Sequence, residues 1–426
     1  MHSIRDELED LSFEILNNDA RKLIIKKLDE IKFDTKDIFE TLSFEMSEIL
    51  NNNNPMIIGI PKERSHQEKR ICLTPDAVSA LTNNGHTVLI EKGAGKNAAF
   101  DDNEYSDSGA NITSNTAKVF GCQIILKVEP PSLAEINMIS PKSILISALQ
   151  LKMQNKEYFE ALSSKKVTAF AFEFIKDSDG TFPAVRQLSE IAGTASILIA
   201  SEIMSITNKG NGLMFGNLSG VPPTEVVIIG AGIVGESAAK SALGLGANIK
   251  VFDNSITKLR SLQDNIGNRM YTSTMQPKNL MKALMRCDVA IGATKGKDRA
   301  PILVNEAMVE LMKPGAVIID VSIDMGGSFE TSELTTHDNP TFEKYGVIHY
   351  CVPNIPARYS RTSSVSLSNI FTPYLLQIAE SGGLENSIRQ DKGLKNGLYL
   401  YHGVITNKSV SNWFDLDYSD LNLLIF

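Results

Sequence analysis

Cysteine and histidine are scarce in this sequence, and neither forms a recognisable binding pattern. The four cysteines lie far apart without a CxxC pair, and the six histidines show neither an HxxxH nor an HExxH spacing. These absences argue against a disulfide framework and against a metal site. The first ten residues are charged where a secretory signal peptide would be apolar. We therefore expect a protein of the reducing, cytoplasmic compartment.

Long apolar runs and an excess of positive charge are also absent. No window approaches the roughly 18 uninterrupted apolar residues that indicate a membrane-spanning helix. The 42 Lys and Arg residues are outnumbered by 50 Asp and Glu, which leaves a formal net charge of -8. Such a balance argues against nucleic acid as a partner. We expect no membrane span and no binding to nucleic acid.

The length and composition are typical of a globular protein with more than one domain. The chain has 426 residues, of which 42% are hydrophobic, enough for two or three domains with a sizeable core. Residues 1–54 repeat apolar positions at helical spacing. They predict a helical N-terminal extension that packs on the body or on a neighbouring subunit. A regulatory arm is the alternative.

From residue 56 onward, short β-branched runs alternate with helical periodicity, which predicts an α/β fold with parallel sheets. A long helical segment, expected at 189–207, separates two series of strands. After a helix at about 364–380 too little chain is left for a third sheet, and we expect it to complete the first lobe. The expected strands are 56–60, 87–91, 123–128, 143–149 and 167–174 in the first series, and 225–230, 248–253, 288–293, 316–322 and 347–352 in the second.

The most specific motif is a glycine-rich turn between an all-apolar strand and an Ala-rich helix. In the sequence GAGIVG, Gly230 permits a tight turn, Gly232 lets the backbone approach a pyrophosphate, and Gly235 allows close helix packing. The phosphates would bind at the helix N-terminus. Asp253 ends the next strand, where a carboxylate accepts hydrogen bonds from the adenosine ribose and repels a 2'-phosphate. The motif predicts NAD rather than NADP; the alternative is a turn that needs glycine only for packing.

Three further residues are candidates for cofactor binding. Lys258 follows Asp253 by five residues, although an exposed lysine at a helix start is the simpler interpretation. Ser189 opens the expected long helix, and Asn354 follows the last expected strand.

With these motifs in place, residues 56–415 resemble the alanine dehydrogenase and nicotinamide nucleotide transhydrogenase family, and the alanine dehydrogenase branch in particular. The resemblance implies two Rossmann-like, doubly wound domains with a cleft between them, and a homo-oligomer, hexamer or dimer. It also implies reversible, NAD-dependent oxidative deamination of L-alanine to pyruvate and ammonium. The similar segments are IGIPKERSHQEKRICLTP (58–75), GVPPTEVVIIGAGIVG (220–235), KPGAVIIDVSIDMGGSFETS (313–332), HYCVPNIPARYSRTSS (349–364) and GLYLYHGVITN (397–407).

The resemblance divides the chain and assigns two catalytic candidates. The substrate domain is expected to comprise residues 55–187 and 355–426, and the NAD-binding domain residues 188–354. Arg70 matches the family arginine that holds the substrate carboxylate, a role that suits the forked guanidinium. Its alternative is a surface arginine that pairs with Glu68 or another acid. Asp324 matches the family aspartate after the IID strand; its alternative is a capping or loop residue.

Two other family residues are not matched. The family lysine that polarises the substrate carbonyl falls at Glu129, and the histidine that serves as acid and base falls at Gln150. A carboxylate would repel an anionic substrate, and an amide does not exchange protons near neutral pH. Lys127, expected two residues earlier on the same strand and about 6.6 Å away, could replace the missing lysine if the loop shifts.

These departures leave three functions open. The first is an alanine dehydrogenase-like oxidoreductase, acting on alanine or a related amino acid. The second is the soluble NAD-binding component of a transhydrogenase, which oxidises no small substrate and needs neither the lysine nor the histidine. The third is a non-catalytic NAD-binding protein.

Overall fold

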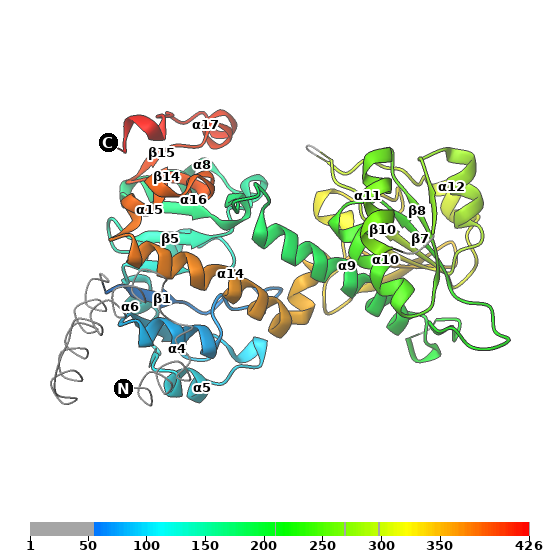
Figure 1. Ribbon diagram of the computed structural model, residues 1–426, viewed down its shortest axis with the longest axis horizontal. Helices are drawn as coiled ribbons and strands as arrows, with labels where there is room; N and C mark the ends of the chain where they lie inside the picture. The colour runs from blue at the N-terminus through cyan, green and yellow to red at the C-terminus, as the bar shows by residue number, and fades with distance from the viewer. Residues whose placement is uncertain (1–54, 209, 268–269, 297–298, 426) are drawn as a thin grey trace, which may run out of the picture. The chain divides into compact units, whose positions relative to one another are not determined.

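The computed structural model describes residues 55–208, 210–267, 270–296 and 299–425. These residues form two mainly parallel sheets with their flanking helices (Figure 1). The predicted helical extension over residues 1–54 lies outside the described residues.

The first sheet contains eight strands in the order β15-β14-β6-β5-β4-β1-β2-β3. Six of them are parallel, whereas β14 runs antiparallel to β6 and to β15. The C-terminal chain therefore adds the last two strands to the sheet that the first strands began. The strands are β1 (Ile57–Ile60), β2 (Thr87–Glu91), β3 (Asn111–Thr113), β4 (Ile124–Leu126), β5 (Ile144–Ser147), β6 (Thr168–Ala171), β14 (Leu398–Tyr401) and β15 (Val404–Ile405).

Both faces of the first sheet are buried because alternate side chains of a strand enter different cores. Ile124 and Leu126 pack in one hydrophobic cluster with α4 and α14, while Ile125 packs in another with α7 and α8. Helices far apart in sequence, α4 and α14, thus cover one face (Figure 1). The helices of this part are α4 (Pro75–Asn83), α5 (Asp102–Asp107), α6 (Thr116–Phe120), α7 (Leu133–Met138), α8 (Lys156–Ser164), α14 (Ser360–Glu380), α15 (Leu384–Gln390), α16 (Lys392–Gly397) and α17 (Lys408–Phe414).

The second sheet contains seven strands in the order β12-β13-β11-β10-β7-β8-β9, with only β12 antiparallel. It is also covered on both faces: Val226 and Ile228 pack with α9, α10 and α11, and Val227 and Ile229 with α12 and α13. The elements are β7 (Glu225–Ile229), β8 (Asn248–Phe252), β9 (Tyr271–Ser273), β10 (Val289–Gly292), β11 (Val317–Asp320), β12 (Thr341–Lys344), β13 (Val347–Tyr350), α9 (Pro183–Ile203), α10 (Ile233–Gly244), α11 (Ile256–Ile266), α12 (Pro277–Leu284) and α13 (Glu306–Glu310).

The predicted fold class is confirmed, and both sheets share one winding order. In the first sheet the chain moves from β1 to β2 and β3 on one side, then to β4, β5 and β6 on the other. In the second it moves from β7 to β8 and β9, then to β10, β11 and β13. This is the doubly wound 3-2-1-4-5-6 order, in which ligands bind beyond the carboxyl ends of the strands where the direction reverses. Residues of a ligand site are therefore expected in the loops that follow β1, β4, β7 and β10.

Several sequence boundaries need correction. The long helix α9 begins at Pro183, not at Ser189, because proline at its first position already has the helical φ angle. Ser189 therefore lies inside the helix. The short strands β3, β9 and β12 were not predicted, since three or four residues of mixed polarity give little periodicity. No helix in the described part of the chain is long and apolar enough to cross a membrane.

Candidate active site

The loop that follows β1 holds a buried arginine in a two-pronged ion pair. Arg70 donates from Nε to Glu68 Oε1 at 2.7 Å and from Nη2 to Glu68 Oε2 at 2.6 Å. Glu68 is fully buried and Arg70 is only 7% exposed. Burial would raise the pKa of Glu68, but the charge and hydrogen bonds of Arg70 hold that pKa below its usual value. Arg70 therefore pairs with Glu68, as the second interpretation of the sequence expected, but this ion pair is buried and does not lie at the surface.

Asn354 links this ion pair to Asp324. Its side-chain Nδ2 donates to Glu68 Oε2 at 3.1 Å, and its backbone N–H donates to Asp324 Oδ1 at 3.1 Å. Asn354 has a φ of 52°, a left-handed conformation that asparagine adopts more readily than most residues. The structure therefore connects Arg70, Glu68, Asn354 and Asp324 by direct hydrogen bonds.

Asp324 follows the IID strand, as the sequence predicted, but the strand ends earlier than the expected residue 322. The strand β11 ends at Asp320, and Asp324 lies four residues later in a 3-10 helix, Val321–Met325. Burial raises the pKa of Asp324, whereas the Asn354 N–H and the charge of Arg70 oppose the increase. The charge of Arg70, the other residue that matches the family, therefore limits the increase in the pKa of Asp324.

Lys127 is buried and already paired. Its Nζ lies 2.6 Å from Glu63 Oε2 and 4.0 Å from Glu135 Oε1, and its side chain is 2% exposed. The expectation that Lys127 and Glu129 share a strand is wrong, because β4 ends at Leu126. A simple shift of Lys127 toward the position of Glu129 would leave two buried carboxylates without their cation.

Glu63 is a further carboxyl group of this network whose pKa is strongly shifted. Its Oε1 accepts the Val128 N–H at 2.6 Å, and its Oε2 accepts from Lys127. Burial raises the pKa of Glu63 to about 7, and nearby Glu68 adds to the increase although Lys127 opposes it. A carboxyl group with this pKa can exchange a proton near neutral pH.

The free energy of unfolding should therefore depend on Glu63. A folded-state pKa above the unfolded value stabilises the fold below the unfolded pKa, and this stabilisation is lost as the pH rises through about 7. Relative to Glu63→Gln, the wild-type protein should lose about 3 kcal/mol between about pH 4 and pH 8. Urea denaturation across this range measures the difference. Glu157→Gln, at an exposed position of α8, serves as control; parallel pH profiles for wild type and Glu63→Gln would contradict the assignment.

Glu129 and Gln150, which replace the family lysine and histidine, differ in their surroundings. Glu129 is half-buried; burial raises its pKa, the charge of Glu68 adds to this, and Lys127 lowers it. It therefore belongs to the charged network. Gln150 is exposed and left-handed, and its backbone N–H donates to Glu173 Oε1 at 3.2 Å. Within the described residues no hydrogen bond joins Gln150 to Arg70, Lys127 or Asp324.

The glycine-rich turn joins β7 to α10 at the point where the second sheet reverses direction. Gly230 has a φ of 115°, which favours glycine. A Cβ atom on Gly235 would lie 1.9 Å from the Gly230 carbonyl oxygen, so that the helix packs against its own turn. Gly232 differs from both: its φ is -83°, and a Cβ there would meet no atom within 4 Å. Neither backbone conformation nor protein packing requires glycine at 232, whereas close approach of a phosphate would.

Asp253 follows β8 and supports the same turn. Its Oδ2 accepts the Ala231 N–H at 2.8 Å, and its Oδ1 accepts the Ser255 N–H at 2.8 Å. A carboxylate has about four acceptor positions, so both oxygens can still accept hydroxyl groups of a ribose. Open space at Gly232 and this free acceptor capacity fit a dinucleotide. Of the other candidates, Lys258 is exposed on α11 and Ser189 is half-buried within α9.

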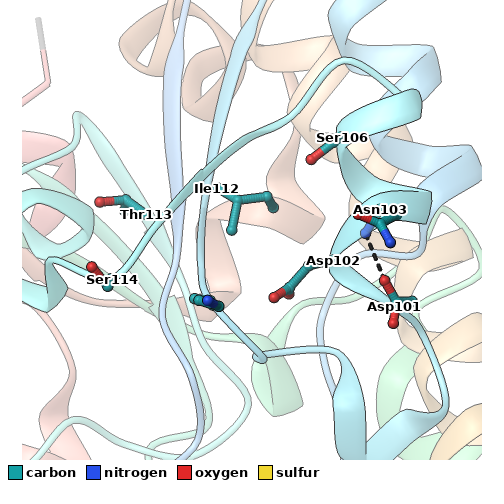
Figure 2. Close-up of a pocket in the computed structure, with 8 residues that line it drawn as sticks. Asp101, Asp102, Asn103, Ser106, Ile112, Thr113 and Ser114 are labelled. Carbon is teal, nitrogen blue, oxygen red and sulfur yellow. Dashed lines mark hydrogen bonds between the residues drawn. The ribbon is translucent and has the colours of Figure 1, made fainter.

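A surface pocket elsewhere contains none of these residues. It lies beside α5 and the ends of β2 and β3 (Figure 2). Its acids cap local structure: Asp101 Oδ1 accepts the Asn103 N–H, drawn as a dashed line, and Asp102 accepts the Gly93 N–H. The pocket is lined by Lys92, Asp101, Asp102, Asn103, Ser106, Ile112, Thr113 and Ser114.

The sequence interpretation missed Glu63, Glu68 as a buried partner, and Asp320. The carboxylate of Asp320 is fully buried and accepts hydrogen bonds from the Ser328 N–H at 2.8 Å and from Ser332 Oγ at 2.7 Å, which shapes the loop that carries Asp324. One signal was available for the glutamates: a dense run of charges directly after the first expected strand. For Asp320 there was none, because an aspartate at a strand end is common.

Comparison with known proteins places this arrangement in a family. The chain matches the alanine dehydrogenase/PNT N-terminal domain over residues 59–192 and the C-terminal domain over residues 196–408. It is 41% identical over 367 residues to the alanine dehydrogenase of Methanococcus maripaludis, covering 85% of this chain and 98% of that protein.

Two solved structures have a similar fold. An L-alanine dehydrogenase structure is similar with a TM-score of 0.78 and 34% identity, over 84% of this chain and 98% of that one. A transhydrogenase from Sinorhizobium meliloti, 22% identical with a TM-score of 0.71 over 83% and 99% of the two chains, shares the fold. These matches confirm the resemblance seen in the sequence, and the chain therefore belongs to the alanine dehydrogenase/PNT family.

Proposed function

We propose that this protein is an NAD-dependent amino-acid dehydrogenase, which converts L-alanine or a related amino acid reversibly to a 2-oxo acid and ammonium. A relative that is 41% identical over 367 residues carries the name alanine dehydrogenase. The observation that carries the proposal is the hydrogen-bonded set of Arg70, Glu68, Asn354 and Asp324, found together with a glycine turn that fits a dinucleotide.

The proposed roles rest on the family resemblance and are compatible with the contacts among these residues. Arg70 binds the substrate carboxylate, and Asp324 accepts a hydrogen bond from the amino group. The glycine-rich turn and Asp253 would hold NAD, which would supply the hydride acceptor for this reaction. Glu129 and Gln150 offer no acid and base pair, so we assign proton transfer to Lys127 and Glu63, whose pKa of about 7 suits it. If the Lys127→Ala variant turned over alanine as fast as the wild type, Lys127 would have no role in proton transfer.

Gly230, Gly232 and Gly235 are proposed to hold the pyrophosphate and Asp253 the ribose, with Lys258, Ser189 and Asn354 as secondary contacts. Asp253→Ala should weaken NADH binding by about tenfold, because two charge-assisted hydrogen bonds are lost. It should also relax discrimination against NADPH, whose 2'-phosphate no longer meets a carboxylate. Fluorescence titrations with both cofactors measure these effects. An unchanged preference for NADH would contradict the role of Asp253.

The direct test of the reaction is NADH oxidation by pyruvate and ammonium, followed by absorbance, with a panel of other 2-oxo acids in parallel. Oxidation with any of them supports the dehydrogenase. NADH binding without turnover on the whole panel would instead favour a non-catalytic NAD-binding protein or a transhydrogenase component, the functions that Glu129 and Gln150 would permit. Hydride exchange between dinucleotides after addition of NADP-binding and membrane subunits separates these two.

A cytoplasmic location and a homo-oligomeric state complete the proposal. All four cysteines are free and buried, which suits a reducing compartment. Native mass measurements with and without residues 1–54 would test the assembly.

A further inference from the structure

We propose that Glu68 is a positioning residue, which holds Arg70 so that the outer edge of its guanidinium faces the substrate carboxylate. This inference rests on the proposed function only in taking the ligand to be a small carboxylate. A competing interpretation of the same contacts is that Glu68 occupies Arg70 and excludes the substrate from it. The two interpretations predict opposite signs for the effect of removing the Glu68 charge.

The guanidinium geometry favours positioning. A guanidinium has five N–H groups on three edges. Glu68 takes the edge formed by Nε and Nη2, with distances of 2.7 and 2.6 Å. No group among the described residues accepts a hydrogen bond from Nη1 of Arg70. The edge formed by Nη1 and the second Nη2 hydrogen therefore has no acceptor among the described residues, and its geometry suits a second carboxylate bound in the same two-pronged way.

Glu68 is itself held from three directions. Besides the two side-chain bonds, its Oε1 accepts the Arg70 backbone N–H at 3.0 Å, and its Oε2 accepts Nδ2 of Asn354 at 3.1 Å. It has no exposed surface, so it cannot turn toward water. A carboxylate fixed in this way sets the plane and direction of the guanidinium, which a long arginine side chain does not hold alone.

The Asn354 contact connects this orientation to the second sheet. Asn354 follows β13, and its backbone N–H holds Asp324. The carboxylate-binding edge of Arg70 and the carboxylate of Asp324 are thus placed by residues that share hydrogen bonds. Loss of the Asn354 side chain should disturb Glu68 less than loss of the Glu68 charge, because it removes one neutral donor.

The experiment is a calorimetric titration of the full chain, saturated with NADH, with pyruvate and with oxalate in separate runs. The variants are Glu68→Gln, Arg70→Met and the double variant. Glu68→Gln should raise the Kd of both carboxylates by at least about tenfold, with the Kd of NADH within about twofold of wild type. If Glu68 acts through Arg70, the double variant should bind no more weakly than Arg70→Met alone.

Glu225→Gln is the matched control. It removes the charge of another glutamate in an ion pair, with Lys250 at 2.5 Å, at the opposite, amino end of a strand. Its carboxylate Kd should equal that of wild type. If Glu68→Gln does not fold, the variant Asn354→Gly is measured instead. Glycine keeps the left-handed backbone of residue 354 and removes only the side-chain donor to Glu68. This variant should raise the Kd of pyruvate by about threefold.

Four results would overturn the inference. The first is that Glu68→Gln binds carboxylates as tightly as wild type or more tightly, and the second is that Asn354→Gly, measured if Glu68→Gln does not fold, binds them as wild type does. The third is that the double variant binds more weakly than Arg70→Met, so that the two effects are independent. The fourth is that the wild type binds neither carboxylate. Failure of the proposed function looks different. Glu68-dependent carboxylate binding without NADH oxidation on the 2-oxo acid panel would remove the dehydrogenase reaction and leave the role of Glu68 standing.

Discussion

A variant that carries both Glu129→Lys and Gln150→His is expected to oxidise NADH with pyruvate and ammonium at least about 100-fold faster than the wild-type protein. A placed acid and base contributes roughly 10²- to 10⁴-fold, and in the wild type the two groups proposed for proton transfer, Lys127 and Glu63, are held in an ion pair with each other. In the wild type, Glu129 is a half-buried carboxylate near Glu68, and it repels an incoming anion. A lysine there would reverse that charge beside the buried acids of the network.

The structure can accept both replacements. Gln150 is exposed, and its φ of 48° is a conformation in which histidine is enriched. The lysine would find Glu68 as a neighbouring carboxylate. Initial rates at several pyruvate concentrations measure the effect, with each single variant as its own control. If the double variant binds NADH but oxidises it no faster than the wild type, Glu129 and Gln150 serve a reaction with a substrate other than pyruvate.

Replacing Gly232 with alanine is expected to weaken NADH binding by at least about tenfold without lowering the melting temperature. The methyl group would enter space that no protein atom occupies within 4 Å, so the fold does not resist it. A bound pyrophosphate would, because its approach to the helix N-terminus needs that space. Calorimetric titration with NADH and thermal unfolding of the same samples give the two quantities.

Two other glycines of α10 make this test selective. Gly244→Ala, also free of neighbours within 4 Å, should leave NADH binding unchanged and stabilise the helix by up to about 1 kcal/mol. Gly235→Ala should lower the melting temperature, because its Cβ would lie 1.9 Å from the Gly230 carbonyl oxygen. Equal NADH affinity in Gly232→Ala and Gly244→Ala would show that no phosphate approaches the turn.

The contrast between β4 and the glycine turn shows where sequence patterns stop being informative. The turn, its flanking strand and Asp253 are close together in the sequence, and their local geometry follows from the glycines and the apolar run. Lys127 and Glu129 are equally close to each other, but the position at which β4 ends depends on neighbouring strands that come from elsewhere in the chain. The displacement expected between the two side chains therefore did not apply.

By itself the sequence determined the α/β class, the two series of strands and the residues of the glycine-rich turn, because periodicity and glycine chemistry act over a few neighbouring positions. Only the tertiary structure decided the partners of the buried charges. Arg70 meets Glu68, Lys127 meets Glu63, and Asn354 reaches Glu68 from 286 residues away. The physical reason is that a charge can be buried only where an opposite charge or hydrogen bonds compensate it. The fold decides whether that partner is a near neighbour in the sequence, as for Arg70, or comes from a distant part of the chain, as for Lys127.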